Sequence, residues 1–305
     1  MSKVFFAVAL GSLIATTGWA VPKAGTAHFQ RSRSGDAGRP IIPFHDVNGR
    51  GLLVKTWFGD CGPLNFVLDT GAGVSIIGKA VVKRCGLMTR NSTNSLAGGL
   101  SNARIDSGEE ATLPRLALGT VNNNFDRSIV AVVVNDLPSG VDGVLDPTEA
   151  FHPFGYAIDF PHHELTVFDS VAPHLNLSEQ PEDGTVVRWI REHDGNRPFV
   201  YLGDGRLALI DTGSAFGFAI TYAAVSAHRR TPRAIQDLSG ASIQSKRVAP
   251  TTITIGELVL HSVPTDVLTG VSAGAPLLLG RDALYPFRIT FDPAAKLIAI
   301  EPASR

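Results

Sequence analysis

Asp69-Thr70-Gly71, preceded by the apolar run Phe66-Val67-Leu68, recurs later in the chain as Asp211-Thr212-Gly213, preceded by Leu207-Ala208-Leu209-Ile210. Each copy is followed by a small residue and then by another apolar stretch. An aspartate at the end of a buried strand is costly, because an ionised carboxylate loses hydration there unless partners or a function compensate. The two copies therefore predict a duplicated unit whose halves each bring one carboxylate to a shared site.

The landmarks around the two tripeptides recur in the same order. Gly98 follows Asp69 at the same spacing as Gly240 follows Asp211. Two further pairs correspond, namely Leu116-Ala117-Leu118-Gly119 with Ile253-Thr254-Ile255-Gly256 and Phe160-Pro161 with Asp292-Pro293. Tandem duplication explains this agreement better than chance, and a repeat of only two copies excludes a solenoid.

The composition indicates a β-rich globular protein. The chain has 305 residues, of which 44% are hydrophobic and 18% charged, and its 31 Gly and 19 Pro predict many turns. The formal net charge is −1, so no strong attraction to nucleic acid or to an anionic membrane is expected. A partner has to be recognised by shape and chemistry instead.

The N-terminus has the pattern of a secretory signal peptide over residues 1–20. Lys3 precedes an apolar segment, residues 4–17, and Gly18-Trp19-Ala20 provides small residues at a cleavage site. An uncleaved anchor is the alternative, but the segment is short for a membrane span and Ser12 interrupts it. We expect a secreted or periplasmic protein that has no membrane contact after cleavage. The polar residues 21–40 predict a flexible leader, with a short inhibitory propeptide as the alternative.

The two cysteines leave two readings open. Cys61 and Cys85 can form a disulfide in an oxidising compartment, and two buried free thiols are equally ordinary. Neither cysteine belongs to a CxxC motif, so zinc and thioredoxin chemistry lack support. We expect no metal and no cofactor.

Short strands and turns are predicted along the whole chain. Strands are expected at residues 51–58, 64–68, 129–134 and 143–145, with a turn at 59–63, a helix at 79–85 and a hairpin at 159–165. The expected units are a first lobe at residues 41–170, a linker at 171–184 and a second lobe at 185–303.

These residues resemble the retropepsin-like and pepsin-like aspartic proteases, whose lobes each contribute an Asp-Thr/Ser-Gly loop. The resemblance covers about residues 41 to 303. Leu278-Leu279-Gly280 matches the family's hydrophobic-hydrophobic-Gly strand, and Arg281-Asp282 follows it as in retropepsins. Two departures stand out. Asp146 replaces the expected Gly in the first half, and Gly73 and Ala215 replace the acids that usually pair with the arginine, which leaves the role of Arg281 open.

The resemblance implies an all-β, bilobal acid-protease fold, with two pseudo-twofold-related β-barrel-like lobes and an active-site cleft between them. It also implies Gly-rich flaps, for which the candidates are Gly98, Gly99 and Gly240. Because these segments contain no Tyr or Trp, the chain is more similar to a fused retropepsin dimer than to a pepsin. Since both halves are in one chain, a monomer is expected.

The expected chemistry follows from the acid pair. Two carboxylates in contact cannot both ionise cheaply, so Asp69 and Asp211 are predicted to share a proton and to activate water for peptide hydrolysis without an acyl-enzyme. The resemblance implies that Thr70 and Thr212 brace the two loops. Three further loop residues are expected to support them: Gly71, Gly213 and Ser214, the last by a hydrogen bond to Asp211. The expected partner is a peptide or an unfolded protein.

Other hypotheses are weaker. A single Asp-Thr-Gly is usually a turn, but duplication in matching context argues against that reading. The segment 73–79 imitates a phosphate loop but lacks its hydroxyl residue, and His162-His163-Glu164 lacks the spacing of a metal motif. A catalytically silent protease fold that binds or inhibits peptides is the alternative to an active endopeptidase, favoured by Asp146 and by the missing acids.

Overall fold

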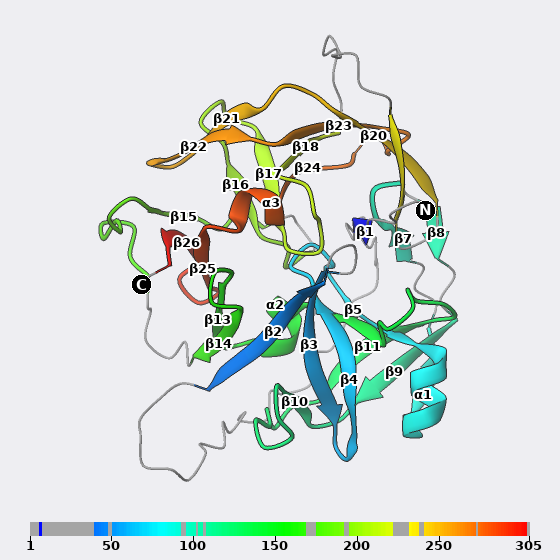
Figure 1. The fold of residues 1–305 in the computed structure, drawn as a ribbon. Coiled ribbons are helices and arrows are strands. Elements are labelled where there is room, and N and C mark those ends of the chain that lie inside the picture. Colours follow the sequence, from blue (N-terminus) through cyan, green and yellow to red (C-terminus); the bar gives the residue numbers. More distant parts are fainter. Residues whose placement is uncertain are drawn as a thin grey trace.

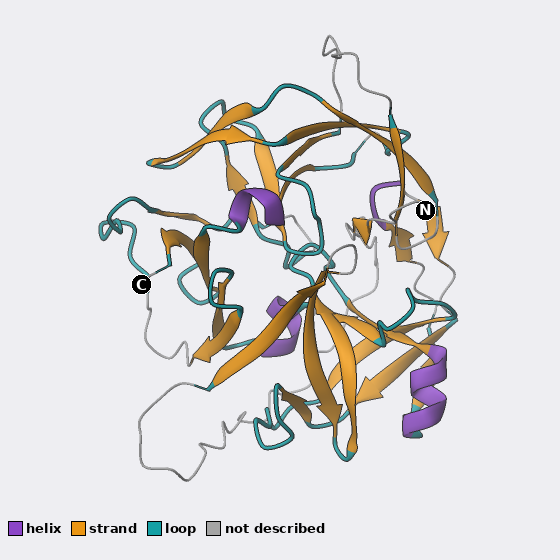
Figure 2. Cartoon of the chain, viewed as in Figure 1, coloured by secondary structure: helices purple, strands orange, loops and turns teal. Residues whose placement is uncertain are grey.

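The computed structural model describes residues 6–7, 40–47, 51–92, 96–101, 103–105, 108–168, 175–191, 195–221, 232–237, 241–272 and 274–303. Strands form most of these residues and the helices are short, so the protein is all-β (Figure 2). The sheets formed by the described residues are open, where the resemblance implied barrel-like lobes. No helix within the described ranges is long and apolar enough to cross a membrane.

The largest sheet runs through the centre of the molecule (Figure 1). Its strands are β2 (Ile41–Val47), β3 (Gly51–Phe58), β4 (Cys61–Leu68), β5 (Ser75–Gly78), β6 (Thr89–Asn91), β9 (Glu109–Leu113), β10 (Leu116–Leu118), β11 (Ile129–Val134), β12 (Gly143–Leu145), β13 (Gly155–Asp159), β14 (Glu164–Phe168), β15 (Thr185–Arg188), β25 (Phe287–Asp292) and β26 (Leu297–Pro302). They lie in the order β15-β26-β25-β13-β14-β2-β3-β4-β12-β5-β11-β9-β6, and β10 pairs with β3.

A second sheet is built mainly from the later part of the chain. Its strands are β1 (Phe6–Ala7), β16 (Phe199–Tyr201), β17 (Leu207–Asp211), β18 (Phe218–Ile220), β19 (Arg233–Asp237), β20 (Ser242–Arg247), β23 (Thr265–Thr269) and β24 (Leu277–Gly280). Their order is β1-β19-β20-β23-β18-β24-β17-β16. The remaining elements are the hairpins β7 (Leu96–Gly98)–β8 (Ala103–Ile105) and β21 (Thr251–Ile255)–β22 (Leu258–Val263), the helices α1 (Lys79–Cys85), α2 (Pro147–Phe151) and α3 (Arg281–Leu284), and the 3-10 turn η1 (Gly99–Ser101).

The strands that lead into the two tripeptides have equivalent neighbours. β12 lies between β4 and β5, parallel to the first and antiparallel to the second. In the same way, β24 lies between β17 and β18, parallel to the first and antiparallel to the second. Gly143 allows this close packing, because a Cβ atom there would lie only 2.6 Å from the carbonyl oxygen of Ile76. Each tripeptide therefore begins at the end of a strand, β4 or β17, that pairs in parallel with its neighbour β12 or β24.

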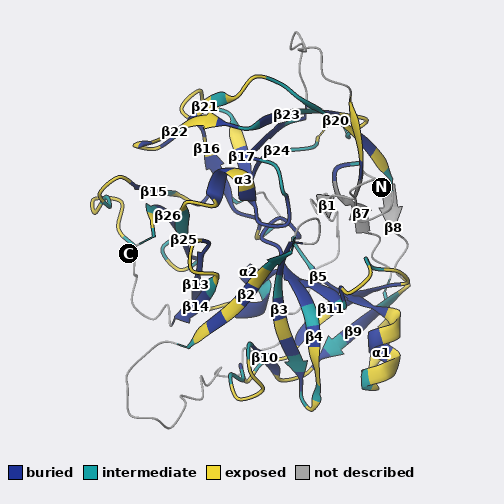
Figure 3. Ribbon diagram, viewed as in Figure 1, coloured by how far each residue is buried: buried dark blue, intermediate teal, exposed yellow. Residues whose placement is uncertain are grey.

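The early and late parts of the chain meet at β13 and β25. These strands pair antiparallel, with Tyr156 opposite Phe291 and Ile158 opposite Ile289. The rings of Tyr156 and Phe291 are stacked with centroids 4.7 Å apart, and both side chains are fully buried. The main hydrophobic core spans both parts, and buried residues line the strands that converge in the middle of the view (Figure 3). We call residues 41–168 the first half and residues 185–303 the second half.

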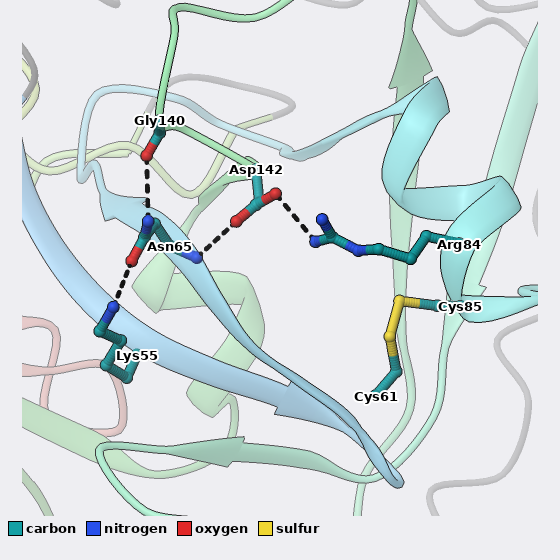
Figure 4. A network of polar contacts seen from close by, with 7 residues as sticks. All are labelled: Lys55, Cys61, Asn65, Arg84, Cys85, Gly140 and Asp142. Carbon is teal, nitrogen blue, oxygen red and sulfur yellow. Dashed lines mark hydrogen bonds and ion pairs between the residues drawn. A yellow bond between two sulfur atoms is a disulfide. The ribbon is translucent and has the colours of Figure 1, made fainter.

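A disulfide fastens the outside of the first half. Cys61 at the start of β4 is bonded to Cys85 at the end of α1, with their Cα atoms 5.5 Å apart. Next to it, Asp142 accepts hydrogen bonds from the backbone N–H of Asn65 at 2.8 Å and from Arg84 at 3.0 Å (Figure 4). Of the two readings of the cysteines, the structure contains the disulfide.

Most of the expected elements are confirmed. The strands at 51–58, 129–134 and 143–145 and the helix at 79–85 have the predicted bounds. The turn predicted at 59–63 is shorter, because β4 begins at Cys61 and pairs with β3 from there. Of the predicted linker, residues 175–184 are described and contain no helix or strand, whereas 171–174 lie outside the described residues. Of the signal peptide and leader, only residues 6–7 and 40 are described.

Candidate active site

Asp69 and Asp211 lie at the inner ends of two buried strands. Asp69 directly follows β4 and Asp211 is the last residue of β17, and both are 0% exposed. The strands reach the interior because their residues are apolar, and the chain turns at the glycine two positions after each aspartate. We call residues 69–71 the first loop and residues 211–213 the second loop. Folding thus buries two carboxyl groups that are far apart in the sequence.

Two threonines connect the loops by reciprocal hydrogen bonds. The Thr70 hydroxyl donates to the Ile210 carbonyl at 2.6 Å and accepts the Thr212 N–H at 3.1 Å. The Thr212 hydroxyl donates to the Leu68 carbonyl at 3.0 Å and accepts the Thr70 N–H at 3.1 Å. Each hydroxyl therefore bonds both to the opposite loop and to the opposite strand, which is the bracing that the resemblance implied.

The glycines of the loops let each carboxyl approach the opposite loop. A Cβ atom on Gly71 would lie 2.8 Å from Cγ of Asp211, and one on Gly213 would lie 2.5 Å from Cγ of Asp69. Real Cβ atoms do not come so close to other heavy atoms. Only glycine fits at these two positions, and the two carboxyl groups face each other across the loop pair.

Each carboxyl has one oxygen held by the backbone and one without a partner. Oδ1 of Asp69 accepts the Gly71 N–H at 2.8 Å, and Oδ1 of Asp211 accepts the Ser214 N–H at 3.0 Å. Within the described chain, Oδ2 of both aspartates is buried without a hydrogen-bond partner. Ser214 supports Asp211 through its backbone, because its hydroxyl accepts the Phe216 N–H instead. The two Oδ2 atoms are the groups left to hold a proton or a ligand.

The electrostatics favour one shared proton. Burial raises the pKa of Asp69 well above its usual value, and the charge of Asp211 raises it further. Burial also raises the pKa of Asp211, whereas the contact with the Asp69 carboxyl, then the backbone N–H groups and the positive charge of Arg281, oppose the shift. Two carboxyls in such contact titrate as a pair, so the pair keeps a proton into the neutral range.

Arg281 holds the second loop from behind. Its side chain is 5% exposed, and one guanidinium nitrogen donates to the carbonyls of Thr212 and Gly213 at 2.8 and 3.1 Å. Its Nε lies 3.7 Å from a carboxylate oxygen of Asp46. The role that the sequence left open is therefore loop support, with Asp46 from the first half as the acidic neighbour.

Asp146 lies behind the first loop, at the position that corresponds to Gly280 behind the second loop. It follows β12 and is 1% exposed. Its backbone N–H lies 3.3 Å from the hydroxyl of Ser75, whose own N–H donates to Glu149 at 3.1 Å. The sequence predicted a special role for Asp146 but not for Glu149. Glu149 lies three residues after Asp146, in the helix that Asp146 caps, and this spacing could have indicated it.

The first flap candidate reaches the second half. Gly98 ends β7 opposite Ala103, and Gly99 begins η1 at the tip of the hairpin. Leu100 in η1 is fully buried in a cluster whose other buried members all belong to the second half, and its carbonyl accepts the Ser272 N–H at 2.9 Å. Gly240 lies outside the described residues, between β19 and β20. No group of His, Cys, Asp or Glu among the described residues is arranged to hold a metal.

Comparison with known families bears on the first loop. A family model described as aspartyl protease matches residues 54–145. The matched residues contain β4, the first loop and β12, and they end immediately before Asp146. Asp211 lies beyond the match. None of the curated proteins matches the chain significantly. The matched region is thus similar to an aspartyl protease domain.

Proposed function

We propose that this chain is an aspartic endopeptidase with two related lobes, in which Asp69 and Asp211 activate water to hydrolyse a peptide bond. The observation that carries the proposal is the loop pair: two buried carboxyls face each other and reciprocal threonine hydrogen bonds hold the loops together. The aspartyl protease match over residues 54–145 supports it independently. Equivalent strand pairing around β12 and β24 supports two lobes that arose by duplication.

The reaction needs only the pair and one water molecule. The ionised carboxyl takes a proton from water while the oxygen of that water bonds to the carbonyl carbon, and the protonated carboxyl gives its proton to the carbonyl oxygen. The resulting gem-diol collapses when the first carboxyl protonates the leaving nitrogen and the second takes a proton back. The C–N bond breaks, the pair again holds one proton, and no covalent enzyme intermediate forms.

An extended peptide or unfolded protein is the proposed substrate. In the structure, Phe6 and Ala7 lie as a parallel strand along β19, opposite Gln236 and Asp237. An extended apolar segment therefore finds hydrogen-bonding groups at the edge strand β19, and strand addition of this kind is a common mode of peptide recognition. The disulfide and the apolar N-terminal segment support export to an oxidising compartment. Since both acid loops are in one chain, we propose that it acts as a monomer.

Isosteric replacement of each acid tests the proposal. Asp69→Asn and Asp211→Asn are each expected to reduce cleavage of casein or unfolded peptides by about 10⁴-fold, because each variant lacks one proton donor or acceptor. Assays from pH 3 to 7, with and without a statine-type inhibitor, report the activity, and melting curves report folding. Asp136→Asn, at an exposed position, is the matched control and should cleave normally.

Two outcomes would contradict the proposal. Substantial cleavage by either purified variant would exclude the shared-proton pair. Absence of inhibitor-sensitive cleavage by the unmodified protein at every pH would favour the alternative, a silent fold that binds peptides, which the unusual Asp146 also favours.

A further inference from the structure

Asp146 is a buried carboxyl that the proposed reaction does not use. It follows Leu145, whose carbonyl accepts the Asp69 N–H at 3.0 Å, so its backbone is joined directly to the first loop. Its Oδ1 accepts the Thr148 N–H at 2.9 Å and thereby caps α2. Its Oδ2 is buried and has no hydrogen-bond partner in the described part of the chain. A carboxyl in this state is costly to ionise, and any charge on it acts next to Asp69.

Titratable and charged groups reach Asp146 from four elements. Glu149 lies on α2, Tyr156 on β13, Asp69 in the first loop, and Arg197 in the segment before β16. Burial and then the charge of Glu149 raise the pKa of Asp146 to about 8, and Arg197 opposes the shift. Asp146 therefore keeps its proton at neutral pH and becomes an anion beside Asp69 only in mildly alkaline solution.

The second loop has the opposite electrostatic background. Gly280 and Ala283 stand where the first half has Asp146 and Glu149, and Arg281 contacts the loop carbonyls from behind. The positive charge of Arg281 lowers the pKa of Asp211, whereas negative charge on Asp146 raises the pKa of Asp69. Both effects move the shared proton toward Asp69, that of Arg281 at every pH and that of Asp146 only once it ionises in mildly alkaline solution.

We propose that Arg281 polarises the acid pair, so that Asp69 holds the shared proton and acts as general acid while Asp211 is the ionised general base, and that Asp146 reinforces this assignment once it ionises in mildly alkaline solution. Both are positioning residues, since neither touches the reacting atoms. The assignment rests on the proposed protease function. When the pH rises, ionised Asp146 makes Asp69 keep its proton longer, so Asp146 extends the activity on the alkaline side.

The pH profile of kcat/KM for Asp146→Asn tests the assignment. Asparagine keeps an oxygen for the Thr148 N–H but cannot ionise, so we expect the basic limb to move to lower pH and the acid limb to stay. Asp136→Asn, which removes an exposed acid of the first half, is the control and should move neither limb. A basic limb that stays in place for Asp146→Asn, or equal loss of kcat/KM at every pH, would overturn the assignment.

A melting experiment tests the coupling without requiring activity. Asp146 and Asp69 ionise near pH 4 when unfolded but keep protons when folded, so each lowers stability as the pH rises above 4. The Tm of Asp146→Asn should therefore fall less than that of the parent between pH 5 and pH 8.5. Asp69→Asn and the double variant complete a double-mutant cycle. At pH 8.5 the Tm shift of the double variant should differ from the sum of the two single shifts.

The two experiments separate the possible failures. Additive Tm shifts would show that the carboxyls do not interact and would overturn this inference, even if the protein cleaves peptides. A parent without any cleavage, combined with non-additive shifts, would overturn the protease function and leave the coupling standing. Asp146→Ser, which keeps a neutral capping oxygen for α2, replaces Asp146→Asn if that variant does not fold.

Discussion

Behind the first loop the chain places two acids, Asp146 and Glu149, whereas behind the second it places Gly280, Ala283 and the cation Arg281. The backbone pairing is equivalent on the two sides, with β12 beside β4 and β24 beside β17. A shared backbone therefore does not require shared electrostatics. A symmetric loop pair can hold its proton asymmetrically, because the cation Arg281 lies behind Asp211 whereas the titratable carboxyl of Asp146 lies behind Asp69.

Removing the cation of the second half should have the largest effect on stability. Arg281→Met leaves the carbonyls of Thr212 and Gly213 without a donor and Asp46 without its cationic neighbour, which we expect to cost about 4 kcal/mol. Urea unfolding measures the loss. Arg288→Met, whose ion pair with Glu301 is partly exposed, is the control and should cost less than about 1 kcal/mol. Equal losses for the two variants would show that Arg281 does not support the loop.

The disulfide offers a second difference between the halves. Cys61 and Cys85 are the only cysteines of the chain, so the second half has no counterpart. Replacing both by Ser releases a loop closed across 24 residues and should lower the free energy of unfolding by about 3 kcal/mol on the chain-entropy model. Urea unfolding with and without reductant measures this. Reductant should destabilise the parent and leave the double variant unchanged, and a parent insensitive to full reduction would contradict the prediction.

The threonine pair probes the symmetric part of the site and should give the smallest of these losses. Thr70→Val and Thr212→Val each delete a hydroxyl that makes one donated and one accepted bond across the loops, so each should cost about 2 kcal/mol. Thermal and urea unfolding of both variants compare the two sides. The serine variants, which keep the hydroxyl, should recover most of the stability. Clearly unequal losses would show that the asymmetry extends into the loops themselves.

Much of the fold was predictable because local sequence patterns indicate its strands and helices. The strands at 129–134 and 143–145 are short apolar runs bounded by turn residues, and their bounds are confirmed. The helix at 79–85 is confirmed too, and it ends at Gly86, which takes the left-handed conformation that glycine allows. Strand order was not predictable in this way, because pairing between β13 and β25 joins segments that no local pattern connects.

The candidate site was predictable in part. The two tripeptides pointed to Asp69 and Asp211, and the structure brings their loops together. The support from Arg281 was not predictable, because its hydrogen bonds go to backbone carbonyls, which no residue pattern reveals. Arg197 was missed for a related reason: it belongs to the second half, but its charge acts on Asp146 of the first.

The linear chain is enough to show that the protein is β-rich and carries two matching acid loops, because composition and repetition do not depend on folding. Which groups face those acids follows from the folded structure instead. Burial, the unpartnered Oδ2 atoms and the contrast between the titratable Asp146 and the cationic Arg281 all depend on contacts between distant segments. A pKa depends on distance and solvation, and both are set only when the chain has folded.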